Sequence, residues 1–495
     1  MTVATEQSGE PPALGHAEIR TIIFGIMLAM LLAALDQTIV ATALPTIGAD
    51  LNDFTSLSWV VTAYLLASTA VTPLYGKLSD IHGRGPVMIF AIVLFTIGSL
   101  ACALAPSMLV LVLARGLQGL GGGGLISLAQ TIIADVVPPR ERGRYQALIA
   151  SVFAASSIAG PVLGGVIAQH IHWSFIFWIN LPLGLGAFLM IRKIMSRLPR
   201  HERPHKLDVV GAVLLIVAAV SLLLALSWGG VVYPWTGRVV LGLLAVALAT
   251  SILFVWRMRV APEPFLPLSI LANQVVATGI GAAFFIYGNL VALSIISPMY
   301  FETVWGYSAS EAGMALIPQM AGTVLGAISS GRAMSGMKHY KLPAMLGAAM
   351  SVACLSTLAL LPAETSKAVQ IGLFALMGLG IGTVLPLSTV AIQNAVPPQQ
   401  MGTVTGAANF FRSLGAALLV AVLGAVLLGT LGTLGQSDIN VLAHGADQAV
   451  LVYAFRLVFA TAAGALLCGL VFLVAMRELP LRATVRSAPE AALID

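Results

Sequence analysis

A single aspartate interrupts a long apolar stretch near the start of the chain. Residues 21–44 read TIIFGIMLAMLLAALDQTIVATAL, and Asp36 is the only charged side chain among them. A charge inside a bilayer is costly, so it is retained chiefly where it contacts a substrate or carries an ion or proton. Burial disfavours the charged form of a carboxylate, which allows such a group to take up and release protons. Asp36 is therefore predicted to couple protons, with a polar contact between helices as the structural alternative.

Two arginines also lie within apolar stretches. Arg115 follows the run MLVLVLA, and Arg412 lies well inside the stretch 403–430. An arginine within a membrane span needs an acceptor or a water-filled cavity. We predict that Arg115 takes part in proton transfer, with a structural ion pair as the alternative. For Arg412, a role in substrate binding and a position at the membrane interface are both open.

The composition is typical of a membrane protein. Of 495 residues, 58% are hydrophobic and 9% are charged, whereas soluble domains are roughly a quarter charged. The basic residues lie in short segments between apolar runs, so the pI of 9.2 indicates membrane topology and no nucleic-acid partner. Cys102, Cys354 and Cys468 lie inside apolar runs, so no disulfide or metal site is expected. No nucleotide-binding or catalytic motif is evident, so the sequence predicts neither a cofactor nor an enzyme.

Fourteen apolar stretches are long enough to span a bilayer, which takes about 20 residues. They are 21–44, 57–76, 86–105, 107–133, 144–168, 175–194, 208–227, 237–256, 273–297, 312–331, 342–361, 369–393, 403–430 and 453–475. With the N-terminus in the cytoplasm, twenty of the 25 Lys and Arg residues lie in cytoplasmic segments, three in outer segments and two within spans. This bias follows the positive-inside rule. We therefore expect a multi-pass protein of the cytoplasmic (inner) membrane with both termini inside the cell.

The chain also contains an internal repeat. Residues 119–143 (GLGGGGLISLAQTIIADVVPPRERG) match residues 378–402 (GLGIGTVLPLSTVAIQNAVPPQQMG) without a gap. Arg115 has Phe374 as its counterpart, so its charge is not part of the duplicated framework. The duplication predicts two six-helix halves and two additional central helices. The predicted divisions are a tail at 1–19, a first half at 20–194, a basic linker at 195–207, the additional pair at 208–256, a second half at 257–476 and a tail at 477–495.

Five stretches resemble motifs of the major facilitator superfamily, and specifically of its fourteen-spanner drug:proton antiporters. The resemblance covers about residues 20–475 and implies an all-α major facilitator fold. The stretches are LDQTIVATALP at 35–45, GKLSDIHGR at 76–84, RGLQG at 115–119, GPVLGG at 160–165 and HWSFIFWINLPLG at 172–184.

The resemblance implies roles for particular residues. It links Asp36 and Arg115 to proton coupling. It implies that Gly76, Asp80, Gly83 and Arg84 form a latch that holds the halves together in the outward-facing state. An ordinary solvated loop is the alternative. It also implies that Gly160, Pro161, Gly164 and Gly165 form an antiporter motif typical of exporters. Ordinary packing of small residues is the alternative. We interpret 172–184 as a membrane anchor.

Together these features predict a proton-driven secondary exporter of hydrophobic, amphipathic or cationic small molecules that works by alternating access. A dedicated exporter of one metabolite, lipid or peptide is the alternative on the same fold. The expected partners are protons, such substrates and the lipid bilayer. A monomer is expected, and accessory export proteins in a two-membrane cell are left open by the sequence. The predicted cavity residues are Asp36, Gln37, Gln118, Phe284, Tyr287, Asn289, Asn409 and Arg412.

Overall fold

The computed structural model describes residues 16–194, 207–361, 365–433 and 448–482. The predicted tails 1–19 and 477–495 and the linker 195–207 lie largely outside these residues. The described helices are α1 (His16–Asp50), α2 (Leu57–His82), α3 (Arg84–Ala103), α4 (Met108–Val136), α5 (Pro139–His170), α6 (Phe175–Trp178), α7 (Asn180–Ile194), α8 (Val209–Trp228), α9 (Arg238–Val260), α10 (Leu268–Ala272), α11 (Gln274–Trp305), α12 (Ala309–Gly336), α13 (Leu342–Leu360), α14 (Lys367–Asn394), the 3-10 turn η2 (Pro398–Gln400), α15 (Met401–Thr433) and α17 (Gln448–Ala475).

The fourteen predicted spans are confirmed. Among the described residues, fourteen helical segments are long and apolar enough to cross a membrane, and each coincides with one predicted stretch. Helices are the expected form because a bilayer offers backbone groups no other hydrogen-bond partner. Most segments are longer than predicted; the first, for example, continues to Asp50. Polar residues extend the helix toward the interface, where hydropathy no longer reveals it.

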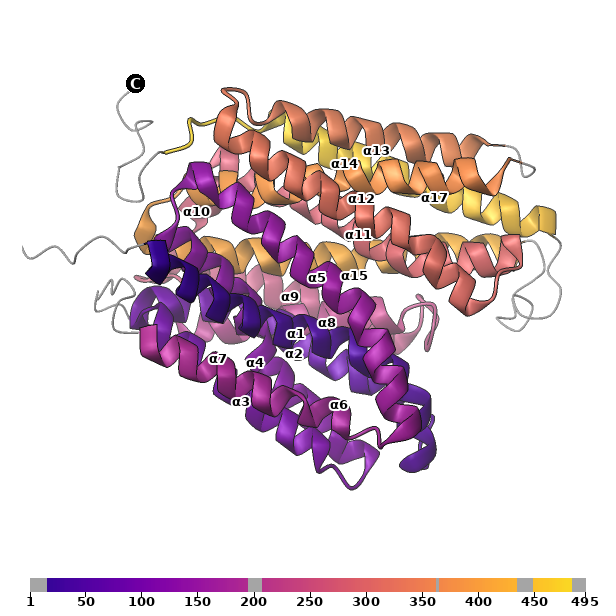
Figure 1. The fold of residues 1–495 in the computed structure, drawn as a ribbon, viewed down its shortest axis with the longest axis horizontal. Coiled ribbons are helices and arrows are strands. Elements are labelled where there is room, and N and C mark those ends of the chain that lie inside the picture. Colours follow the sequence, from indigo (N-terminus) through magenta and orange to yellow (C-terminus); the bar gives the residue numbers. More distant parts are fainter. Residues whose placement is uncertain (1–15, 195–206, 362–364, 434–447, 483–495) are drawn as a thin grey trace, which may run out of the picture.

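The helices form two bundles that lie side by side (Figure 1), α1–α7 in the first and α11–α17 in the second. The bundles meet at the end where α1 begins and α17 ends, and they diverge toward the opposite end. We call these the closed end and the open end. Each bundle has its own apolar core, which includes Met30 and Phe95 in the first and Phe301 and Phe374 in the second.

The additional pair, α8 and α9, lies behind the junction of the two bundles in the view of Figure 1. Ala219 of α8 shares an apolar cluster with Ala70 of α2 and Phe410 of α15. Phe254 of α9 lies in a second cluster that includes Ala407 of α15. The pair therefore covers the seam between α2 and α15, where one half meets the other.

The internal repeat relates α4 to α14 and α5 to α15. The 259-residue offset aligns Pro139, the first residue of α5, with Pro398, the first residue of the short turn before α15. Continued along these helices, the same offset pairs Phe153 of α5 with Arg412 of α15. Each half thus carries one arginine at a position where the other half carries phenylalanine.

Candidate functional site

Asp36 and Arg115 form an ion pair inside the first bundle. Arg115 Nη1 donates to Asp36 Oδ2 at 2.6 Å, and the two side chains are 1% and 0% exposed. Arg115 Nε donates to the Val60 carbonyl at 2.9 Å, and the guanidinium lies 4.4 Å from the centroid of the Tyr64 ring. The pair is the contact that each of these intramembrane charges requires, since an isolated charge would be strongly destabilised there.

Three neutral residues complete this cluster. Gln118 and Asn180 donate to Asp36 Oδ1 at 2.8 and 3.0 Å. Both also donate to the Ser99 hydroxyl, at 3.2 and 2.9 Å. All three are buried. We refer to Asp36, Ser99, Arg115, Gln118 and Asn180 as the polar cluster.

Sequence reasoning missed two members of the polar cluster. Asn180 lies in the stretch 172–184, which the sequence led us to interpret as an anchor, and Ser99 lies in a span without any charged residue. The available signal was Asn180 itself, because a buried amide in a span needs hydrogen-bond partners. At Asn180 the helix restarts as α7 after Ile179, which brings its side chain to α1 and α3.

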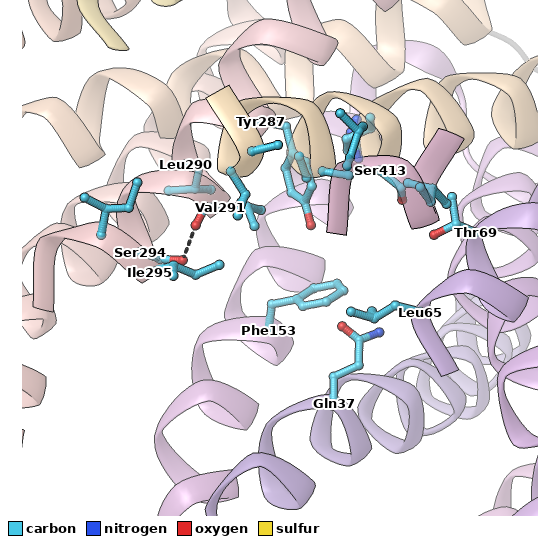
Figure 2. A pocket seen from close by; sticks show the side chains of 18 of the residues that line it. Gln37, Leu65, Thr69, Phe153, Tyr287, Leu290, Val291, Ser294, Ile295 and Ser413 are labelled. Carbon is cyan, nitrogen blue, oxygen red and sulfur yellow. Dashed lines mark hydrogen bonds between the residues drawn. The ribbon is translucent and has the colours of Figure 1, made fainter. Parts of the chain in front are cut away.

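A cavity of about 1190 Å³ lies between the two bundles. Its wall includes Leu431, near the end of α15, and Val231 in the loop after α8, so the cavity extends to the open end. Figure 2 shows the Tyr287 hydroxyl pointing from α11 toward Phe153 and Gln37 on the opposite wall. The additional pair contributes Leu223 and Leu226 of α8 to the lining.

Half of the predicted cavity residues line this space and half do not. Gln37, Tyr287, Asn409 and Arg412 line it. The others are absent from its wall, and they are Asp36, Gln118, Phe284 and Asn289.

Helical geometry explains this division. Successive residues of a helix point about 100° apart, so Gln37 faces the cavity while Asp36 faces the polar cluster. Asn289 is fully buried two residues beyond Tyr287, and its amide donates to the Phe285 carbonyl at 3.0 Å. The Phe284 backbone lies against Gly415, where α11 and α15 are in close contact.

Arg412 lies beside neutral hydrogen-bonding groups. Its Nη2 donates to the Thr389 hydroxyl at 3.0 Å, and its Nη1 lies 3.5 Å from Asn409 Oδ1. The guanidinium carbon is 5.4 Å from the centroid of the Tyr287 ring. Asn409 also donates to Gln130 Oε1 of α4 at 2.8 Å, which connects the two halves at the wall of the cavity.

Asp80 joins the halves at the closed end. Its carboxylate accepts from the backbone N–H groups of Gly402 and Thr403 at 2.9 and 2.7 Å, and from the Thr403 hydroxyl at 2.6 Å. These groups lie in the first turn of α15, where the helix dipole favours a negative charge. Arg84 pairs with Asp80 and donates to Asp135 Oδ2 at 2.6 Å and to the Pro398 carbonyl at 3.3 Å.

Glycines bring the backbones together at the same end. A Cβ on Gly76 would lie 2.3 Å from the Gly402 carbonyl oxygen, and one on Gly143 would lie 2.7 Å from that of Gly331. The first contact joins α2 to α15 and the second joins α5 to α12. Gly83, the fourth predicted latch residue, lies between α2 and α3 with φ +86°, a conformation that favours glycine.

The predicted antiporter motif packs α5 against α1. A Cβ on Gly160 would lie 2.0 Å from Thr38 Oγ1, and one on Gly164 would lie 2.5 Å from the Ile39 carbonyl oxygen. Pro161 lies inside α5 beside this contact. Gly165 has no atom within 4 Å of its Cβ position, so it takes no part in this close contact.

Comparison with known proteins identifies the family. A model described as Major Facilitator Superfamily matches residues 26–420, so the chain belongs to this superfamily of membrane transporters.

Two relatives come from Bacillus subtilis (strain 168). One is named multidrug transporter protein MdtP and is 36% identical over 424 residues, which cover 85% of this chain and 77% of the relative. The other, named multidrug resistance protein 3, is 35% identical over 83% of this chain and 80% of the relative. The chain therefore fits the multidrug-efflux type of transporter within the superfamily.

Solved structures share the fold. The human organic anion transporter MFSD10 matches with a TM-score of 0.64 and 18% identity, over 94% of this chain and 100% of that one. The proton:xylose symporter XylE matches with a TM-score of 0.58 and 15% identity, over 91% and 95% of the two chains. At these identities the comparison concerns the fold alone.

Proposed function

We propose that the protein is a proton-driven exporter of amphipathic small molecules that works by alternating access in the cytoplasmic membrane. The observation that carries the proposal is the buried ion pair of Asp36 with Arg115, one residue away from a cavity between two bundles. Protonation of Asp36 would remove its charge and leave Arg115 unpaired, so it would change the stability of the cluster. Because Gln37 follows Asp36 on α1, a movement of this helix would also alter the cavity wall.

The orientation follows from the charges. With both termini in the cytoplasm, Arg84 and the other basic residues of the closed end lie on the cytoplasmic side of the membrane, as the positive-inside rule requires. The cavity then opens to the outside, and the contacts of Asp80 hold the exporter in an outward-facing state. Return to an inward-facing state would require these contacts and the two glycine seams to separate.

The cavity has room for bulky substrates. Its volume is about 1190 Å³, against about 300–1,000 Å³ for common ligand pockets, and it extends to the open end. The names of the relatives, which are multidrug transporters, favour a broad substrate range over a single metabolite. The predicted export of cations needs a carboxylate that faces the cavity, and Asp36 is instead held by Arg115.

Energetically, one proton that crosses a potential of 100 mV supplies about 2.3 kcal/mol. This free energy would sustain roughly a 50-fold gradient of a neutral substrate, since about 1.4 kcal/mol corresponds to a factor of ten.

Transport into everted membrane vesicles tests the proposal. The neutral dye N-phenyl-1-naphthylamine and the cation ethidium serve as probes, with an acid-inside pH gradient imposed on vesicles that contain the full chain. We expect uptake of N-phenyl-1-naphthylamine that stops when the gradient is collapsed and is absent in Asp36→Asn. Uptake that needs no gradient, or wild-type uptake by Asp36→Asn, would contradict the proposal, and ethidium uptake would extend it to cations.

A further inference from the structure

Arg412 is the single charged side chain in the cavity wall formed by the described residues. The remaining lining consists of apolar side chains, amides, hydroxyls and glycines. No carboxylate of the described residues lies within ion-pair distance of its guanidinium, since none of the ion pairs includes it. The positive charge is therefore balanced by no anion in this part of the protein.

The guanidinium also has unused donors. Its Nε is buried and has no hydrogen-bond partner among the described residues. Its Nη2 is engaged by the Thr389 hydroxyl, and its Nη1 has only the long contact of 3.5 Å to Asn409. A planar guanidinium is suited to bind a carboxylate, sulfonate or phosphate through two parallel N–H bonds. The position thus has the chemistry of an anion-binding site.

The residues that line the cavity indicate what kind of molecule would fit with the acidic group. Leu290, Val291 and Ile295 lie on α11, the helix that carries Tyr287, and also line the cavity, while Phe153 lies on the opposite wall (Figure 2). The Tyr287 ring lies 5.4 Å from the Arg412 guanidinium carbon, and its hydroxyl points into the space (Figure 2). A ligand that fits these groups has one acidic head and an apolar or aromatic body.

We propose that the cavity selects amphipathic organic anions and that Arg412 binds their acidic head group. This inference rests on the proposed function and narrows its substrate class. Thr389 and Asn409 position the guanidinium, and the apolar wall accepts the body of the molecule. Lipophilic cations are disfavoured because Arg412 would repel them and the described wall offers no carboxylate in exchange.

The charge of the substrate alters the energetics of export. When a proton enters and a singly charged anion leaves, both movements are driven by a negative interior. Two charges that cross 100 mV supply a driving force equivalent to roughly a 2,000-fold gradient. Exchange of a proton for a monovalent cation moves no net charge, so the potential contributes nothing. Anion export should therefore be driven by a membrane potential even when no pH gradient is present.

Two dyes that differ by one sulfonate test the proposal. They are 1-anilinonaphthalene-8-sulfonate, an anion, and N-phenyl-1-naphthylamine, which lacks the sulfonate. Binding of each to the purified full chain in detergent is measured by fluorescence titration for wild type, Arg412→Gln and Arg412→Lys. We expect the ratio of anion affinity to neutral affinity to fall at least tenfold in Arg412→Gln, and to fall less in Arg412→Lys, which keeps the charge. Thermal unfolding of each variant verifies that it is folded.

An unchanged affinity ratio in a folded Arg412→Gln would overturn the inference, as would tighter binding of the cation tetraphenylphosphonium than of the equally shaped anion tetraphenylborate by wild type. If Arg412→Gln does not fold, the comparison of these two ions on wild type still decides the matter. A protein that binds the anion through Arg412 but shows no proton-driven transport would contradict the proposed function and leave the inference intact. Transport of the neutral dye without preference for the anion would do the reverse.

Discussion

The two halves use their intramembrane arginines in opposite ways. Arg115, in the first half, is buried in the polar cluster and paired with Asp36 at 2.6 Å. Arg412, in the second half, lines the cavity and has neutral neighbours only among the described residues. The repeat pairs each arginine with a phenylalanine, Phe374 and Phe153. Arg115 thus has its counter-charge within the protein, whereas Arg412 has none among the described residues.

Under the proposed function, the two sites have separate tasks. A buried pair responds to protonation, because loss of one charge leaves the other uncompensated. An unpaired guanidinium in a cavity responds to ligand charge. A protein with both on one site would make proton and substrate compete directly. Here the two sites lie in different halves, so the proposed coupling requires movement of the helices that connect the polar cluster to the cavity, which are α1 and α4.

Removal of the Asp36 charge should have the largest effect. Asp36→Asn leaves Arg115 buried without a counter-charge, which should lower the free energy of unfolding by about 3–5 kcal/mol. The double variant that also carries Arg115→Gln should regain most of the lost stability, but it should not regain proton-driven export. Thermal unfolding in detergent and vesicle transport measure the two effects.

Glu302→Gln is the matched control, because Glu302 is an exposed carboxylate on α11. It should behave like wild type in both measurements. If Asp36→Asn is as stable as Glu302→Gln, the ion pair does not hold the polar cluster together.

Bulk between α1 and α5 should have the next largest effect. Gly164→Leu places atoms against the Ile39 carbonyl, and overpacking of this kind costs about 1–3 kcal/mol. Since α1 carries Asp36 and Gln37, we expect slower export in vesicles at a given proton gradient. Gly165→Leu is the control, because no atom lies within 4 Å of its Cβ position. Equal export by the two variants would show that this contact does not limit transport.

The latch should influence from which side of the membrane solvent and substrate can reach Arg412. Asp80→Asn removes the charge that the first turn of α15 stabilises, and hydrogen bonds to charged groups contribute about 1.5–3 kcal/mol. We expect the closed end to open more often, so that a cysteine in place of the buried Ala134 reacts faster with a maleimide added from the cytoplasmic side. The reaction is followed in a chain whose exposed Cys468 is replaced.

Glu141→Gln, at an exposed position in the first turn of α5, controls for loss of a negative charge at the same end. A labelling rate in Asp80→Asn equal to that of Glu141→Gln would mean that the glycine seams alone keep this end closed.

The smallest effect should come from the support of Arg412. Thr389→Val removes the hydroxyl that accepts from Nη2 at 3.0 Å while nearly preserving the side-chain shape. A typical net hydrogen-bond contribution predicts a loss of roughly twofold to tenfold in affinity for 1-anilinonaphthalene-8-sulfonate. Binding titration measures it, with Thr250→Val, a half-buried position on α9 outside the cavity lining, as a control. A gain in anion affinity would instead show that the hydroxyl competes with the ligand for the guanidinium.

The sequence is informative about the spans because apolar length alone identifies them. It also identifies Asp36, Arg115 and Arg412 as unusual, since charges in apolar stretches are rare. It does not predict which side of a helix faces the cavity, because that depends on how each helix is rotated against its neighbours. For this reason the sequence does not predict that Tyr287 faces the cavity while Asn289 does not. The lack of a partner for Arg412 is likewise a property of the assembled bundle.

Transport driven by membrane potential alone tests the separation of the two sites most directly. Everted vesicles that contain wild type, Asp36→Asn or Arg412→Gln receive a lumen-positive potential without a pH gradient. Uptake is then measured for 1-anilinonaphthalene-8-sulfonate and N-phenyl-1-naphthylamine. We predict that Asp36→Asn transports neither dye, and that Arg412→Gln loses its preference for the anion while it still transports in response to the potential. Equal losses for both dyes in both variants would contradict the account, because a single shared site would then explain proton and substrate binding.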